Sequence, residues 1–258
     1  MSESREDDIW ILGAAGRAGR AIAAELARRH RSMTLVGRNK VALLDVATSL
    51  GIDARIVVAS AIDEIGAAIT RSAPRVVINT IGPFAQTAVP LVKACPAGTH
   101  YVDVGNELPA LLSLYAMHDE LVATNRCVVH GAGWGVLATE SVVRKLCSGR
   151  PAPLQVRVDN MASVKASGPL GHTLANGILD GIAYGGRRYA HGRLKFAFVG
   201  SDHEALTLPD GSTAKTGLIP TAELEAAYRA SGGPMLSPDS LERQVGRFAL
   251  YFHSLLYC

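Results

Sequence analysis

The feature that most constrains the fold of this chain is a glycine-rich turn between a short apolar run and a helical pattern. The turn reads Gly13-Ala14-Ala15-Gly16-Arg17-Ala18-Gly19, and the apolar run at 9–12 precedes it as a buried strand would. Glycines at this spacing permit a tight turn, so that backbone N–H groups can approach a pyrophosphate that the helix N-terminus stabilises. The turn therefore predicts a dinucleotide site. The residues expected to contact the dinucleotide here are Gly13, Ala15, Gly16, Arg17, Ala18 and Gly19.

The first half of the chain repeats this order of strand and helix. The strands we expect lie at 9–12, 33–36, 55–58, 76–79, 101–104 and 127–130. The helices we expect lie between them, at 17–29, 40–49, 61–71, 87–95 and 109–124. The strands show little alternation of apolar and polar residues, as is typical of parallel strands buried on both faces. We therefore predict an α/β fold with a Rossmann-type, doubly wound parallel sheet.

The pattern changes near residue 150, where Gly149, Pro151 and Pro153 interrupt the chain. Beyond them we expect a smaller α+β lobe that binds substrate or forms a dimer, and hence two domains, 1–150 and 151–258. Its expected strands lie at 154–158, 195–199, 205–208 and 212–216, the last two around a Pro-Asp-Gly turn. Its expected helices lie at 173–183, 221–230 and 240–256.

The end of the second expected strand bears on the choice of cofactor. It reads Leu35-Val36-Gly37-Arg38-Asn39, with no acidic residue where one would bind the ribose 2′-hydroxyl of NAD. An arginine can instead pair with a 2′-phosphate. Gly37, Arg38 and Asn39 therefore favour NADP(H), although a solvated arginine at a helix start would look the same.

Two further glycine-bearing loops follow expected strands. After the fourth strand, a Gly-Pro pair within Asn79-Thr80-Ile81-Gly82-Pro83-Phe84 requires an irregular loop at a carboxyl end, where open α/β sheets bind ligands. We expect Thr80, Gly82, Pro83 and Phe84 to contact the cofactor. After the sixth strand comes Gly131-Ala132-Gly133-Trp134-Gly135, in which Trp134 either walls the nicotinamide pocket or packs the two lobes together.

These segments together resemble the saccharopine dehydrogenase-like NADP-dependent reductases, a family that includes the mycobacterial trans-acting enoyl reductases. The resemblance is specific over residues 8 to 145. The matching segments are Gly13 to Gly19, Gly37-Arg38, the Asn79 to Phe84 loop, Cys95, Gly98-Thr99-His100-Tyr101-Val102-Asp103 and Glu107. Gly105-Asn106 stands where the family usually has Thr-Gly, and Trp134 where it has Phe.

The resemblance implies an NADP(H)-dependent oxidoreductase that transfers hydride to a C=N or C=C bond of a small or carrier-linked substrate. It also implies that the segment 163–178 opens the second domain, with His172 facing the cofactor cleft.

Three residues are candidates for catalysis: Asp103, Tyr101 and His172. Asp103 lies at the carboxyl end of the fifth expected strand and could transfer a proton, or could organise the loop that follows. Tyr101 shares its face of the strand and could donate to substrate or bond within the protein. His172 is either a proton donor or a structural histidine. Glu107 and Cys95 are more simply explained as a first-turn carboxylate and a core residue.

Other classes of protein fit less well. Short-chain dehydrogenases need Tyr-x-x-x-Lys, which none of the seven tyrosines provides. A non-catalytic NADP(H)-binding sensor or scaffold remains an alternative. A net charge of +3 without a basic run gives no reason to expect nucleic acid, and the four dispersed cysteines suggest neither a metal nor disulfides. With no membrane span or leader evident, we expect a cytoplasmic protein that can form a homodimer.

Overall fold

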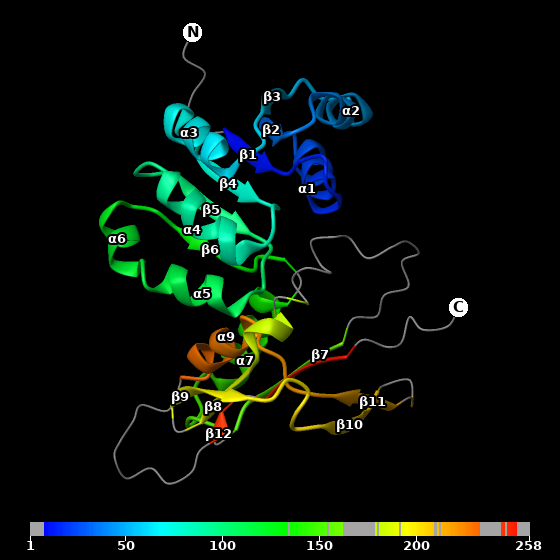
Figure 1. Ribbon diagram of the computed structural model, residues 1–258, viewed down its shortest axis with the longest axis vertical. Helices are drawn as coiled ribbons and strands as arrows, with labels where there is room; N and C mark the ends of the chain where they lie inside the picture. The colour runs from blue at the N-terminus through cyan, green and yellow to red at the C-terminus, as the bar shows by residue number, and fades with distance from the viewer. Residues whose placement is uncertain are drawn as a thin grey trace. The chain divides into compact units, whose positions relative to one another are not determined.

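The computed structural model describes residues 8–133, 135–153, 155–161, 179, 181–190, 192–208, 211, 213–232, 244–245 and 247–251. The chain divides into two compact units (Figure 1). The first contains Met1–Gly105 and Leu112–Ala132, and the second contains Asn106–Leu111 and Gly133–Cys258.

The first unit is built on a six-stranded sheet in the order β3-β2-β1-β4-β5-β6. Every neighbouring pair of strands is parallel. The predicted Rossmann-type, doubly wound fold is thus confirmed. The strands are β1 (Ile9–Leu12), β2 (Met33–Gly37), β3 (Arg55–Val58), β4 (Val76–Asn79), β5 (His100–Asp103) and β6 (Val128–Val129). The helices are α1 (Arg17–Arg28), α2 (Lys40–Leu50), α3 (Ile62–Ser72), α4 (Phe84–Ala94), α5 (Leu108–Tyr115) and α6 (His118–Ala123), of which α5 begins in the second unit.

Successive residues of the central strand pack into two different cores. Trp10 and Leu12 lie in one cluster with residues of α3 and α4, whereas Ile11 lies in the other with residues of α1 and α2. Both faces of β1 are therefore covered, which explains why its sequence is apolar throughout. β1 pairs with β2 on one side and β4 on the other, so the strand order reverses between β1 and β4. Ligands of such sheets bind outside the carboxyl ends of the strands at this reversal.

The single helix expected at 109–124 is instead two helices, α5 and α6, which are separated at Ala116 and Met117. Arg126 follows them, and its guanidinium donates to the carbonyl oxygens of Val92 and Cys95, at 2.9 and 3.0 Å. These carbonyls lie at the C-terminal end of α4, where the Val92 oxygen also accepts from the backbone N–H of Cys95 at 3.2 Å. Arg126 thereby fixes the end of α4.

The second unit begins earlier than expected. α7 (Val136–Cys147) precedes the Gly149–Pro153 segment, yet it packs against α9 (Glu223–Ala230) and belongs to the second unit. The expected boundary at residue 150 therefore marks the end of a helix, and the units separate after Ala132 instead.

The described strands of the second unit form three small sheets. β10 (Glu204–Thr207) and β11 (Thr213–Thr216) form the expected antiparallel hairpin. β9 (Arg193–Ala197) begins two residues before the strand expected at 195–199 and pairs with β8 (Gly186–Ala190), which was not expected.

The helix predicted at 240–256 is wrong. β12 (Gln244–Val245) pairs with β8, and β13 (Arg247–Tyr251) pairs in parallel with β7 (Arg157–Met161). Pairing with distant strands overrides a short apolar pattern that suits either structure. Most of the helix expected at 173–183 lies outside the described residues, and no described helix is long and apolar enough to cross a membrane.

Candidate cofactor and active site

The glycine turn is packed so closely that side chains would not fit. Gly13 has a φ of +75°, and a Cβ added there would lie 2.7 Å from Thr80 Oγ1. A Cβ on Gly19 would lie 2.4 Å from the carbonyl oxygen of Gly13. The glycines therefore let α1 begin directly against the end of β1. Gly16 is the N-cap residue of α1 and provides no side chain to bond the first N–H groups, and the first turn contains no acidic residue. The N-terminus of this helix can therefore accept an anion.

Thr80 supports this turn from the neighbouring strand. Its hydroxyl donates to the carbonyl oxygen of Leu12 at 2.7 Å, and its backbone N–H donates to the same oxygen at 3.1 Å. Thr80 was expected to contact the cofactor. In the structure it is bonded to the end of β1, directly before the glycine turn.

The ribose end of the site, as expected from the sequence, would lie where β2 ends. Arg38 and Asn39 are exposed there, and the Asn39 side chain caps α2 by accepting from the backbone N–H of Ala42 at 3.1 Å. The first turn of α2 contains no acidic residue. The glycine cradle and this acid-free end together fit a dinucleotide with a 2′-phosphate.

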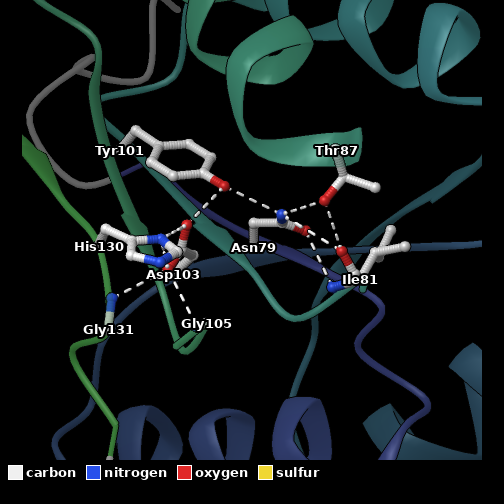
Figure 2. Close-up of polar contacts among 8 residues, drawn as sticks. All are labelled: Asn79, Ile81, Thr87, Tyr101, Asp103, Gly105, His130 and Gly131. Carbon is white, nitrogen blue, oxygen red and sulfur yellow. Dashed lines mark hydrogen bonds and ion pairs between the residues drawn. The ribbon is translucent and has the colours of Figure 1, made fainter. Parts of the chain in front are cut away.

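A buried hydrogen-bond network lies beside the carboxyl ends of β4, β5 and β6 (Figure 2). The backbone N–H of Ile81 donates to Asn79 Oδ1 at 2.9 Å, which identifies the other amide atom of Asn79 as the donor. Asn79 Nδ2 lies 3.0 Å from Tyr101 Oη and 3.2 Å from Thr87 Oγ1. The Tyr101 oxygen therefore accepts from Asn79, and its proton points elsewhere.

Asp103 accepts the hydrogen bond of the Tyr101 hydroxyl and has three further polar partners. Its Oδ2 accepts from the Tyr101 hydroxyl at 3.0 Å, and its Oδ1 accepts from the backbone N–H groups of Gly105 and Gly131, each at 3.0 Å. His130 Nδ1 lies 2.9 Å from the carboxylate. Asp103 is fully buried, and its carboxylate joins the loop after β5 to the loop after β6.

His130 was not expected to take part in the site. Its side chain is 1% exposed, and its Nε2 atom is buried without a hydrogen-bond partner among the described residues. Its ring meets the edge of Phe84, with centroids 6.5 Å apart. One signal in the sequence could have pointed to it: a histidine that ends the sixth expected strand immediately before Gly131-Ala132-Gly133.

The other candidates divide into buried and undescribed residues. Tyr101 is fully buried, and burial together with the Asp103 charge raises the pKa of its hydroxyl far above the usual value. Burial likewise raises the pKa of Cys95 to about 12, as expected for a core thiol. Glu107 forms an isolated β-bridge with Thr221 in the second unit. His172 and Trp134 lie outside the described residues, so their roles stay predictions.

The remaining loop residues expected at the cofactor follow β4. Pro83 occupies the N-cap position of α4 and Phe84, the first residue of that helix, is buried. The described residues contain no group of three or more side chains that could hold a metal ion.

A glycine cradle beside the reversal point of a doubly wound sheet defines the first unit as a Rossmann-type dinucleotide-binding domain. Residues 9–130 match the family model described as the saccharopine dehydrogenase NADP binding domain. The first unit is therefore similar to the NADP-binding domain of saccharopine dehydrogenases, and this match supports NADP(H) as its cofactor.

Its relatives are known from sequence and from structure. A candidate trans-acting enoyl reductase of Mycobacterium tuberculosis is 32% identical over 150 residues, which are 55% of this chain and 36% of that protein. The trans-acting enoyl reductase of Mycobacterium leprae is 30% identical over 151 residues, which are 56% of this chain and 36% of that protein. The match thus spans little more than a third of these relatives. Apo saccharopine dehydrogenase (L-Glu forming) from Saccharomyces cerevisiae shares the fold, with a TM-score of 0.61 and 15% identity over 95% of this chain and 55% of that chain.

Proposed function

We propose that this protein is an NADPH-dependent reductase that transfers hydride to the C=C bond of an enoyl group conjugated to a carbonyl. The observation that carries the proposal is the juxtaposition, at one edge of one sheet, of a cradle for NADP(H) and a buried Asp-His pair. The names of the relatives support C=C over C=N as the bond reduced.

In this proposal, different residues of the first unit bind the cofactor and support the transfer of the proton. Backbone N–H groups of the turn from Gly13 to Gly19 bind the pyrophosphate, and Arg38 pairs with the 2′-phosphate. When bound, the cofactor supplies the hydride. The protein must then orient the substrate and provide a proton. Asp103 serves this chemistry indirectly, because its four hydrogen bonds fix His130 and the two loops that follow β5 and β6.

The test is oxidation of NADPH by the full chain with two probes, crotonyl-pantetheine as an enoyl thioester and a cyclic imine. We expect NADPH oxidation with the thioester and formation of the saturated acyl product, detected by mass spectrometry. Oxidation with the imine alone would show that the reductase acts on C=N bonds. Tight NADPH binding by calorimetry without turnover of either probe would contradict the proposal and favour a sensor.

A further inference from the structure

The directions of the hydrogen bonds in the buried network follow from backbone N–H groups, which can only donate. The N–H of Ile81 can only donate, so Asn79 Oδ1 accepts and Asn79 Nδ2 donates to the Tyr101 oxygen. The Tyr101 hydroxyl must then donate to Asp103. The N–H groups of Gly105 and Gly131 also donate to Asp103, so its carboxylate acts as an acceptor throughout.

This direction determines which ring nitrogen of His130 holds a proton. Since Asp103 accepts from all its other partners, the atom 2.9 Å from it, His130 Nδ1, carries a proton and donates. His130 Nε2 is then the only atom of the His130 side chain left to act on another group. A buried polar atom without a partner is uncommon and calls for an explanation. Here it lies at the carboxyl end of β6, on the edge where ligands of such sheets bind.

We propose that His130 is the proton donor of the reduction, with Nε2–H directed at the substrate and Asp103 as its positioning residue. This proposal rests on the proposed function. When the ring is doubly protonated, the Asp103 carboxylate balances its charge through Nδ1–H.

Reduction of an enoyl thioester adds a hydride and a proton across its C=C bond. Hydride from NADPH forms a C–H bond at the β-carbon, and the π electron pair moves to the α-carbon and the carbonyl oxygen. The Nε2–H bond of His130 breaks as its proton forms a C–H bond at the α-carbon. NADPH is oxidised, the C=C bond is reduced, and neutral His130 regains its proton from solvent.

Two substitutions separate this role from a structural one. In His130→Asn the amide nitrogen replaces Nδ1, so the bond to Asp103 is kept and the group at Nε2 is lost. In His130→Gln the amide nitrogen replaces Nε2, where it can donate a hydrogen bond but cannot transfer a proton. We expect kcat with crotonyl-pantetheine to fall about a hundredfold or more in both variants, as for loss of a general acid. The Kd for NADPH should stay within about threefold of the native value, less than the loss of one hydrogen bond to a charged group would cost.

His118→Asn is the matched control, because His118 is exposed on α6; its turnover should equal that of the native protein. Turnover within about threefold of native in His130→Asn, or in His130→Gln, would overturn the proton-donor role. If the native protein itself reduces no enoyl thioester, the proposed function fails first and this role fails with it.

A measurement on the native protein does not depend on the folding of the variants. Long-range ¹H–¹⁵N spectra of the histidine rings should show Nδ1 of His130 protonated in the free protein. Adding NADP⁺ with the product butyryl-pantetheine should shift the Nε2 resonance and leave that of His118 in place. An Nε2 resonance unchanged at saturating ligand, or a ring protonated only at Nε2, would overturn the proposal.

Discussion

Asp103→Asn is the substitution whose cost can be worked out most directly from the contacts. The backbone N–H groups of Gly105 and Gly131 need an acceptor, so the remaining oxygen should stay where Oδ1 is now. The new NH₂ group then replaces Oδ2 and faces the Tyr101 hydroxyl, which currently donates at 3.0 Å. The Tyr101 oxygen already accepts from Asn79, so its proton would have no acceptor in the network. A buried donor left in this way costs about 1–3 kcal/mol.

Urea denaturation followed by circular dichroism measures this cost. We expect Asp103→Asn to lower the free energy of unfolding by about 1–3 kcal/mol and to change the Kd for NADPH little. Turnover should fall at least about tenfold, because His130 Nδ1 loses the carboxylate that it contacts. Adding Tyr101→Phe removes the stranded hydroxyl, so the double variant should be more stable than Asp103→Asn alone. The exposed Asp45→Asn serves as control and should change stability by less than about 0.5 kcal/mol. Strict additivity of the Asp103 and Tyr101 substitutions would refute the assigned direction of the network.

Three further outcomes follow from the structure. Arg38→Ala should remove most of a ten- to hundredfold preference for NADPH over NADH, because a hydrogen bond to a charged group contributes about 1.5–3 kcal/mol; equal affinity of the native protein for both cofactors, by calorimetry, would contradict this. Gly19→Ala should weaken NADPH binding and destabilise the fold by about 1–3 kcal/mol through overpacking, whereas Gly181→Ala, with open space around its Cβ, should not. Cys95 should resist iodoacetamide at pH 8 while the exposed Cys127 reacts, as read by mass spectrometry. The folded chain keeps the Cys95 proton that the unfolded chain releases, so stability should fall as the pH rises from about 9 to 12, and should fall less in Cys95→Ala.

The first unit could be predicted from sequence because its signals are local. The central strands of the sheet are short buried runs, and most strands are followed by a helical pattern. The glycine turn needs no distant residue to be recognised. The second unit was harder, since β13 pairs with β7 across almost a hundred residues, and an apolar stretch such as Phe248 to Leu250 suits a helix as well as a strand.

The site was predictable only in part for the same reason. The sequence places Tyr101 and Asp103 two residues apart on one strand, and the hydroxyl of one does reach the carboxylate of the other. The contact between Asp103 and His130 joins residues 27 apart in the chain. It depends on β5 and β6 being neighbours in register, which no local pattern reveals. This contact is what favours, in our proposal, the loop-organising alternative for Asp103 over direct action on substrate.

The segment 79–81 belongs to both halves of the site at once. Thr80 holds the end of β1 at the pyrophosphate turn, while Asn79 and Ile81 on either side of it set the direction of the network that ends at His130. The contacts of three consecutive residues thus join the glycine turn to the buried network. We therefore expect a cofactor bound at the turn to slow the opening of the Ile81 N–H bond, so that hydrogen exchange at this single amide would report whether the site is loaded.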